Sequence, residues 1–402
     1  MFKLEGPFPH AREWGMGMVR QRRRPQLLPQ PTSRRFSFNL GGFERDATWM
    51  SNSSSLQQQR KQVLPKAFLT TGSLAGPVRS LSAISVTATC PEPTCECAPT
   101  PTPLMPDGLS IDTVHPLNGT MAAYTQQVVI ATGRPDWTSR IEEDGQGESW
   151  GALARGLKGL LGRGGKYADP YNNFLITNSS FAPAVVTSRN SASAFLFPSF
   201  KYVPSIPVDI TSAPSTNPQN VDLSMFVRAM LLPRQLHDAH SVLPESKRAE
   251  MTGDPELAVR FPNTLDIKHS PTILICGHGG RDKRCGVIGP ILETEFRRVL
   301  QRKGFDTEMG IGDKEDGQGH VNIALISHIG GHKYAGNVIF YIPPRMVTPS
   351  AGPSPLAGKG IWYGRVEPKH IEGIVDETIL RGSVVADHFR GGIGMNGELY
   401  RL

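Results

Sequence analysis

Two cysteines and two histidines in the C-terminal half have types and spacing that suit a metal site. Cys276 follows an apolar run, and Cys285 stands nine positions later, after a loop rich in glycine and basic residues. His328 and His332 are separated by Ile-Gly-Gly. Because glycine adopts positive φ at little cost, the chain can fold back there and direct both imidazoles to one point. The pattern predicts a site with two thiolates and two imidazoles.

These four side chains suit two kinds of metal centre. A [2Fe-2S] cluster needs two protein ligands on each iron, and two pairs from separate loops meet that need. A single zinc ion also takes four such ligands, although zinc-finger cysteines usually stand closer together than these two. The spacing does not choose between a cluster and zinc, and it leaves open that the residues bind no metal and only form turns.

Cys90, Cys95 and Cys97 form a second group, flanked by prolines. They suit a set of redox-active thiols or, with a distant fourth ligand, a small metal site. An exposed segment whose thiols stay reduced is an equal alternative. Five cysteines are an odd number in a long chain without a secretory signal, which disfavours a disulfide framework.

Other polar residues point less clearly to chemistry. His278 follows Cys276 closely, and we interpret it, with the basic residues Arg281, Lys283 and Arg284, as a charged shell around the metal rather than as a ligand. The glycine-rich loops lack the endings of phosphate-binding loops. No Ser/His/Asp order or paired carboxylate stands out, so a redox or electron-transfer protein is favoured over a classical enzyme.

Hydrophobic periodicity predicts the elements that position the metal-binding residues. The expected order is a buried strand at Thr272–Ile275, a helix at Val287–Gln301, strands at Val321–Ser327, Asn337–Ile342 and Ile361–Tyr363, and a helix at Glu367–Leu380 closed by Gly382. This order is typical of a thioredoxin-like α/β sandwich. Strand ends and helix N-termini converge on one edge of such a fold, and a helix N-terminus favours a thiolate at Cys285.

The preceding part of the chain predicts a mixed α/β domain. Strands are expected at Gln127–Thr132, Phe174–Thr177 and Ala194–Phe197, with helical spacing at Val221–Leu232. The glycine-rich stretch Gly151–Gly165 is expected to be a surface loop. The predicted fold class is therefore α/β throughout, with an N-terminal domain at 86–262 and a C-terminal domain at 263–402.

The charge of the chain is concentrated at its beginning. The formal net charge is +7, but residues 1–36 hold eight basic and two acidic residues, which leaves +1 for the rest. This near-neutral remainder argues against nucleic-acid binding. An Arg-rich, acid-poor segment is typical of a mitochondrial presequence, although an ordinary basic arm has the same composition.

Residues 37–85 include a polar run of Ser and Gln at 51–59, which predicts a disordered linker. We expect a mitochondrial protein, most readily of the matrix, with the intermembrane space and the cytosol as alternatives. No stretch approaches the roughly 18 apolar residues of a membrane span.

From about Cys90 onward the chain resembles the sucrase/ferredoxin-like family of fungal proteins. The resemblance rests on the three N-terminal cysteines, Thr132–Trp137, Cys276–Cys285, His328–His332 and Trp362–Val366. It implies a C-terminal thioredoxin-like ferredoxin domain whose [2Fe-2S] cluster is bound by Cys276, Cys285, His328 and His332. A branch of the family is linked to mitochondrial thiol redox quality control, which this resemblance implies as the setting.

Three functions therefore remain open. The first is an iron–sulfur protein acting in electron transfer or thiol redox control, the second is a zinc-stabilised interaction module, and the third is a thiol oxidoreductase that uses Cys90, Cys95 and Cys97. Near the C-terminus, Leu399, Tyr400 and Arg401 resemble the tripeptide that iron–sulfur delivery chaperones recognise, which predicts such a partner. The redox partners themselves are not indicated.

Overall fold

The computed structural model describes residues 78–80, 84–94, 100–106, 108–184, 190–208, 222–308, 319–349 and 352–402. All of these belong to one compact unit. The predicted presequence, 1–36, and most of the predicted linker, 37–85, lie outside the described residues. No helix in the described ranges has the length and apolar character needed to cross a membrane.

The C-terminal half is built on four strands and two helical segments. In chain order they are β8 (Thr272–Cys276), α4 (Lys283–Arg302), β9 (Asn322–Ile326), β10 (Val338–Ile342), β11 (Lys359–Tyr363), the turn Pro368–His370 and α5 (Ile371–Val375), continued by a π-helical end at Asp376–Arg381. Strand β8 is parallel to β9, β10 is antiparallel to β8, and β11 is antiparallel to β10. The resulting order in space is β9-β8-β10-β11.

The N-terminal half repeats that arrangement. Its elements are β3 (Gln126–Ala131), a 3-10 turn at Ile141–Glu143, α1 (Ser149–Leu161), β4 (Phe174–Ser179), β5 (Ser191–Phe197), β6 (Lys201–Pro207) and α2 (Leu223–Phe226), continued by a π-helical turn at Val227–Leu231. Strand β3 is parallel to β4, and β5 and β6 follow in antiparallel order, so the order in space is β4-β3-β5-β6. The predicted α/β class is therefore correct for both halves.

The two halves share one twelve-stranded sheet, joined where β4 meets β9. Short elements complete it: β7 (Leu265–Asp266) beside β6, and β13 (Phe389–Gly394), β14 (Leu399–Arg401) and β1 (Val78–Ser80) beyond β11. A parallel pair of short strands, β2 (Val86–Thr87) and β12 (Val384–Val385), lies outside this sheet. The other elements of the described residues are helix α3 (Glu245–Met251) and turns at Asp238–Val242, Pro255–Arg260, His332–Tyr334 and Ala386–His388. Strand β1 lies within the stretch predicted to be a linker, and the linker boundary at residue 85 stays a prediction.

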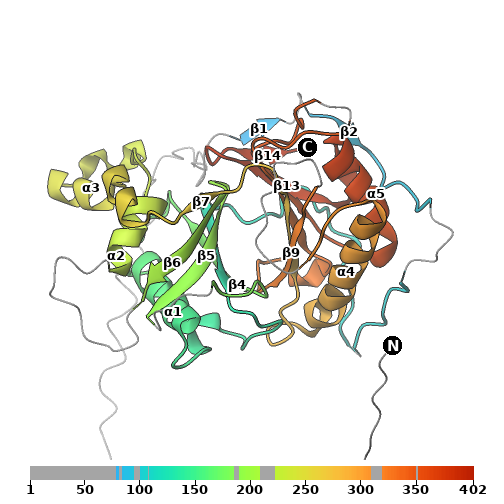
Figure 1. The fold of residues 1–402 in the computed structure, drawn as a ribbon, viewed down its shortest axis with the longest axis horizontal. Coiled ribbons are helices and arrows are strands. Elements are labelled where there is room, and N and C mark those ends of the chain that lie inside the picture. The colour runs from blue at the N-terminus through green and yellow to red at the C-terminus, as the bar shows by residue number, and fades with distance from the viewer. Residues whose placement is uncertain are drawn as a thin grey trace, which may run out of the picture. The chain divides into compact units, whose positions relative to one another are not determined.

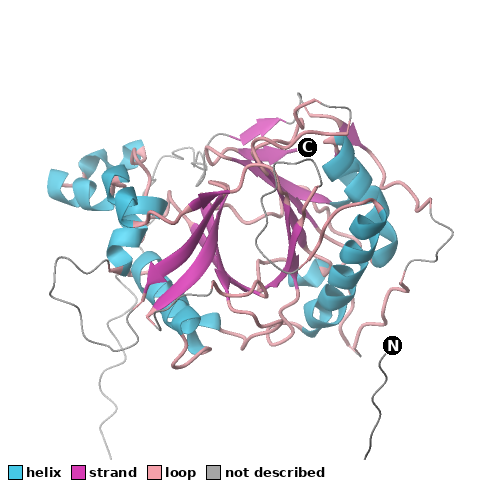
Figure 2. Ribbon diagram, in the orientation of Figure 1, coloured by secondary structure: helices cyan, strands magenta, loops and turns pink. Residues whose placement is uncertain are grey.

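Three hydrophobic cores hold these layers together. One packs α1 and α2 against the N-terminal strands, and a second packs α4 and α5 against the C-terminal strands. In Figures 1 and 2 these helices lie on the outer sides of the strands. The third core lies on the opposite faces of both sets of strands and takes side chains from each half, such as Phe197 and Tyr341, whose rings stack 4.1 Å apart. Because the two halves share this core, their packing does not mark a domain boundary at residue 262. That boundary stays a prediction.

Helix α1 is the main correction to the predicted elements. The sequence predicts a surface loop at Gly151–Gly165, but Ser149–Leu161 is a helix whose apolar face is buried. Glycine lowers helix propensity by about 1 kcal/mol and so hides the helical period. At Gly151 the reason for glycine is steric, since a Cβ there would lie 2.1 Å from the carbonyl oxygen of Gly145.

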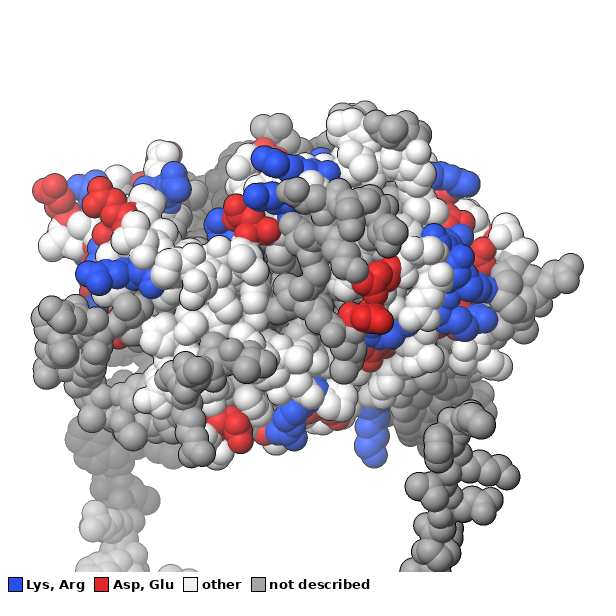
Figure 3. All heavy atoms as spheres, viewed as in Figure 1, with Lys and Arg blue, Asp and Glu red and all other residues white. Residues whose placement is uncertain are grey.

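Charged side chains on the C-terminal helices are largely paired. Figure 3 shows basic side chains gathered near α4 and α5, beside acidic ones. The pairs include Arg298 with Glu295 at 2.5 Å and Lys303 with Asp376 at 2.6 Å. These pairs limit the positive field of this surface.

Candidate metal centre

Cys276 and Cys285 meet where β8 ends and α4 begins. Asp282 caps α4 by accepting a hydrogen bond from the Arg284 backbone N–H at 3.0 Å, which fixes the first turn of the helix. That turn carries Cys285 back over the end of β8. Both cysteine side chains are buried, and both are free thiols in the structure.

The two sulfurs interact directly with each other. A hydrogen bond from the Cys285 thiol lowers the pKa of Cys276 well below its usual range, and the His328 ring beside it acts in the same direction. The same contact raises the pKa of Cys285. The two thiols therefore titrate as a coupled pair, with the lower pKa at Cys276. A metal that displaced their protons would find two adjacent sulfur ligands.

His328 and His332 follow β9 on a turn that glycine makes possible. Gly330 and Gly331 have φ of +86° and +73°, as the Ile-Gly-Gly segment predicts. The two imidazole rings lie with their centroids 5.2 Å apart. The Nδ1 atom of each ring is buried and has no hydrogen-bond partner. Two imidazole lone pairs are thus left available within one small region.

The environment of His332 differs from that of His328. The His332 side chain is 44% exposed, and its Nε2 lies 3.9 Å from the Asp282 carboxylate. Partial burial lowers the pKa of His332, against the opposing effect of Asp282. A largely neutral imidazole, which can act as a ligand, is therefore favoured near neutral pH.

The four predicted residues lie in one neighbourhood. Cys276 contacts both Cys285 and His328, and His328 in turn lies beside His332. Across the described residues, no set of three or more His, Cys, Asp or Glu side chains is arranged to hold one metal ion. The ligand set itself stays a prediction.

Arg390 is a buried charge of this site that the sequence analysis missed. Its guanidinium donates to Asn337 Oδ1 at 2.7 Å, to the Thr120 carbonyl at 2.8 Å and to the Gly330 carbonyl at 3.3 Å. Burial lowers the pKa of Arg390 to about 10, and the two nearby cysteines oppose that shift. The sequence did contain a signal for this residue, because Arg390 stands in a strand whose other residues are apolar or glycine. Its positive charge offsets negative charge on the sulfurs.

His278 is held by backbone groups through both ring nitrogens. Its Nδ1 accepts the His328 backbone N–H at 3.0 Å, and its Nε2 contacts the carbonyl oxygens of Trp137 and Thr138 at 3.1 and 2.9 Å. No ring nitrogen is left for a metal in this arrangement. This argues against ligation by His278, whose ring is held between backbone groups, and its predicted place in a charged shell stays a prediction.

The second cysteine group is only partly described. Cys95 and Cys97 lie outside the described residues. Cys90 is buried, and its thiol donates to the His370 carbonyl at 3.4 Å. Burial, followed by the nearby Asp387, raises the pKa of Cys90 to about 12. The Cys90 thiol therefore resists forming the thiolate that thiol exchange requires.

The C-terminal tripeptide lies within the sheet. Leu399, Tyr400 and Arg401 form β14, which pairs with β13 and β1, and Leu399 is buried. A chaperone that bound these three residues as an extended tail would have to displace a strand. The predicted chaperone contact stays a prediction.

Comparison with known proteins gives one family and a set of named relatives. The family described as Sucrase/ferredoxin-like matches residues 117–391. Proteins named "Altered inheritance of mitochondria protein 32" match from Debaryomyces hansenii, at 31% identity over 71% of this chain and 89% of that protein, and from Meyerozyma guilliermondii, at 35% identity over 42% of this chain and 50% of that protein. The counterpart from Clavispora lusitaniae is 37% identical over 42% of this chain and 52% of its own length.

The matched region thus spans about half the length of the Meyerozyma and Clavispora relatives. No solved structure matches the chain.

Proposed function

The chain belongs to the sucrase/ferredoxin-like family, as its motifs predict, and we propose that it is an iron–sulfur protein in which Cys276, Cys285, His328 and His332 hold a [2Fe-2S] cluster. Its proposed role is electron transfer or thiol redox quality control in mitochondria. The observation that carries the proposal is the meeting of two buried cysteines with two imidazoles whose buried Nδ1 atoms have no partner.

The donor set fits such a cluster. Each iron takes two protein ligands beside the bridging sulfides, so two cysteines and two histidines suffice without three protein ligands around any one ion. An unpartnered buried ring nitrogen costs free energy in the metal-free protein, and ligation would remove that cost. Arg390 supplies a positive charge close to the two sulfurs. When bound, the cluster would supply one-electron oxidation and reduction.

The protein side chains would control how that electron is exchanged. Cys276 and Cys285 are buried, whereas His332 is 44% exposed, so the histidine side of the site is the one open to a redox partner. Two neutral imidazoles in place of two thiolates remove two negative charges from the centre. We therefore expect a reduction potential above that of an all-cysteine cluster.

The proposed fold of the C-terminal half is that of a thioredoxin-like ferredoxin domain. The strand order β9-β8-β10-β11, with α4 between the two parallel strands and α5 after the last, supports this assignment. The mitochondrial location is supported by the names of the relatives and by the Arg-rich composition of residues 1–36.

Anaerobic purification followed by metal and sulfide analysis tests the function. We expect about two irons and two sulfides per chain, and an electron paramagnetic resonance signal in the reduced protein. Substitution Cys276→Ser should remove the iron, whereas Cys90→Ser should leave it. Stoichiometric zinc without sulfide in the wild-type protein would favour the zinc-stabilised module, and thiol exchange abolished by Cys90→Ser alone would favour the oxidoreductase.

A further inference from the structure

The seam between β4 and β9 relates the two halves by reciprocal contacts. The backbone N–H of Ser327 donates to the Asn178 carbonyl, and that of Ser180 donates to the Leu325 carbonyl, each at 2.9 Å. The Ser327 hydroxyl accepts from Asn178 N–H, and the Ser180 hydroxyl accepts from Leu325 N–H, each at 3.0 Å. Ser180 and Ser327 therefore occupy equivalent places in the repeated arrangement.

This equivalence shows what the N-terminal half has at the ligand positions. Ala131 pairs with Ser179, and Cys276 pairs with Ile326, the residues that precede the two equivalent serines. Ala131 thus corresponds to Cys276, and Phe181 corresponds to His328. Neither Ala nor Phe binds metal. The loop after β3 is therefore free to serve another purpose than its counterpart after β8.

That loop contacts the ligand loop of the C-terminal half. Both carbonyl oxygens that the His278 ring contacts, those of Trp137 and Thr138, belong to it. Because Nδ1 of His278 accepts the His328 N–H, its proton is on Nε2 and is donated to these carbonyls. One neutral imidazole thus links the N-terminal half to the backbone of His328. The His278 side chain is itself 1% exposed.

A second contact holds the loop after β8 at its glycines. The Asp136 carboxylate accepts the Gly280 backbone N–H at 3.1 Å and the Trp137 N–H at 2.8 Å. A Cβ at Gly280 would lie 2.0 Å from the Trp137 carbonyl oxygen. The glycines of the ligand loop therefore permit the close approach of the N-terminal loop.

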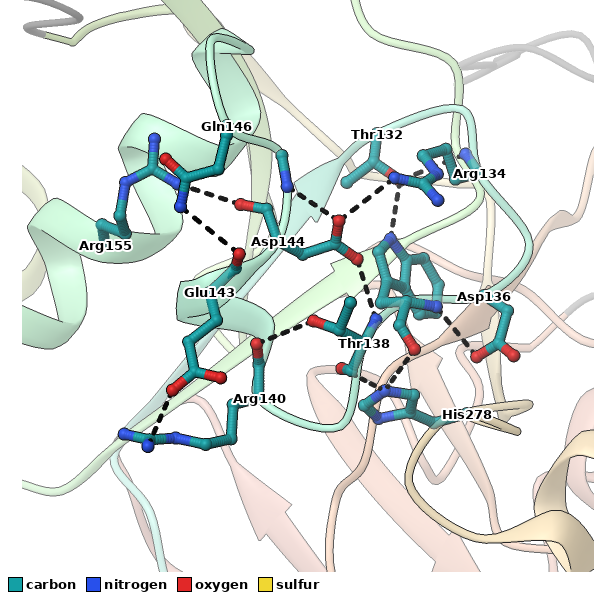
Figure 4. Close-up of polar contacts among 12 residues, drawn as sticks. Thr132, Arg134, Asp136, Thr138, Arg140, Glu143, Asp144, Gln146, Arg155 and His278 are labelled. Atoms are coloured by element: carbon teal, nitrogen blue, oxygen red, sulfur yellow. Dashed lines mark hydrogen bonds and ion pairs between the residues drawn. The ribbon is translucent and has the colours of Figure 1, made fainter. Parts of the chain in front are cut away.

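The N-terminal loop is held in place by its own hydrogen bonds. Asp144 accepts hydrogen bonds from Thr138 N–H at 2.8 Å and from Arg134 at 3.2 Å, and the Trp137 indole donates to the Thr132 hydroxyl at 3.1 Å. Figure 4 shows Thr132, Arg134 and Asp144 on one side of Thr138 and the His278 ring on the other. A carboxylate held by a backbone N–H and a guanidinium resists rearrangement.

We propose that the N-terminal half is a brace for the metal centre, and that His278 is the positioning residue through which its loop after β3 sets the backbone of the ligand His328. This inference rests on the proposed function, because it assigns a task toward the cluster. The N-terminal half has Ala131 and Phe181 at the positions equivalent to the ligands, so it has no metal site of its own there. The proposal gives this half a supporting role instead. His278 acts through His328, because both of its ring nitrogens are engaged by backbone groups.

Three substitutions in the full chain separate the two ends of the link. His278→Asn keeps an acceptor near the place of Nδ1 but does not reach the Trp137 and Thr138 carbonyls. His278→Gln places its amide near Nε2 and loses the acceptor for His328 N–H. His278→Phe keeps a ring and loses both. Ser139→Ala is the control, because it removes only the hydroxyl that Arg281 contacts in the same loop, at 3.2 Å.

Amide hydrogen exchange at His328 in the metal-free protein is the first measurement. We expect exchange at least about tenfold faster in His278→Gln and His278→Phe, and little changed in His278→Asn and Ser139→Ala. This readout does not need a cluster. Unchanged protection in His278→Phe would overturn the link.

The second measurement is the rate at which an iron chelator removes iron from the protein. The electron paramagnetic resonance spectrum is recorded in parallel. All three His278 variants should lose iron about 10-fold faster than wild type or Ser139→Ala, with a shifted spectrum. If His278→Phe does not fold, Asp136→Asn, which weakens the Gly280 contact, is used in its place. If the iron-loaded variants match wild type in both the rate of iron loss and the spectrum, the proposed brace is wrong. If the wild-type protein contains no iron, the proposed function is wrong.

Discussion

The four metal-site side chains contribute two kinds of ligand atom, sulfur and ring nitrogen. Cys276 contributes a sulfur whose pKa its neighbour lowers, Cys285 a sulfur whose pKa the same contact raises, and His328 and His332 ring nitrogens without a hydrogen-bond partner. The balance of charge at the site follows from this mixture, together with the nearby Arg390. Changing one imidazole to a thiolate tests that balance directly.

His332→Cys should retain the cluster and lower its midpoint potential. The substitution places a negative charge where a neutral ring stood, so the oxidised state is favoured, on the order of 100 mV. A potentiometric titration of the purified protein measures the shift. His269→Cys, at a histidine we assign no role in the site, is the control, and a midpoint in His332→Cys equal to wild type would remove His332 from the ligand set.

Cys90 should make the stability of the folded protein depend on pH above about 8.5. The folded state raises the pKa of this thiol to about 12, so the unfolded chain loses the proton first and the folded state retains it. The unfolded state is thereby favoured as pH rises, by up to about 1.4 kcal/mol per pH unit, until pH passes the folded pKa.

Denaturant unfolding of wild type and Cys90→Ala between pH 8 and pH 10 measures this effect. The free energy of unfolding of wild type should fall more steeply with pH than that of Cys90→Ala. Parallel curves would show that Cys90 titrates normally, and would restore it as a candidate redox thiol.

At the scale of elements, the turn after β9 depends on two glycines for different reasons. Gly330 and Gly331 both have positive φ, but a Cβ on Gly330 meets nothing within 4 Å, whereas a Cβ on Gly331 would lie 2.4 Å from Nη2 of Arg390. Since the guanidinium of Arg390 is held by Asn337 and Thr120, it cannot move aside freely.

Gly331→Ala should therefore destabilise the metal-free protein more than Gly330→Ala. The matched variant Gly330→Ala shows the cost of positive φ alone, about 1–2 kcal/mol, and Gly331→Ala adds displacement of Arg390. Denaturant unfolding of both variants gives the difference. Equal losses would indicate that Arg390 relaxes without cost, and that the His328–His332 turn is not buttressed by it.

At the scale of the whole molecule, the shared third core couples the two halves. Phe197 of the N-terminal half stacks on Tyr341 of the C-terminal half, and the Tyr341 hydroxyl donates to Gln127 at 2.7 Å and contacts the Tyr124 hydroxyl at 2.6 Å. All four residues are buried. We expect the two halves to unfold together despite their repeated topology.

Phe197→Ala should lower the free energy of unfolding by about 3–5 kcal/mol in both halves at once. Hydrogen exchange resolves the two halves, because amides of β5 and β10 report separately on each. Protection lost equally in both strands supports one cooperative unit. Protection lost in β5 alone would mean that the halves are independent domains, as the predicted boundary at residue 262 supposes.

Local sequence patterns predicted much of the C-terminal half. Strands at Thr272–Ile275 and Asn337–Ile342 and the two helices stand close to where the periodicity places them, because buried five-residue strands and amphipathic helices are encoded by neighbouring residues. The glycine turn between His328 and His332 was predictable for the same reason. Helix α1 was not, since its glycines weaken the helical signal that its packing requires.

Residue types and their periodicity along the chain are enough to identify the side chains available for chemistry and the order of the elements that carry them. Only the folded protein shows that Arg390 lies beside the sulfurs and that His278 joins the backbones of Thr138 and His328. It also shows that Ala131 and Phe181 stand where the other half has the predicted ligands. These relations join residues about 50 to 140 positions apart. Periodicity reports only on neighbours along the chain, whereas such contacts depend on how the two halves meet at the β4–β9 seam.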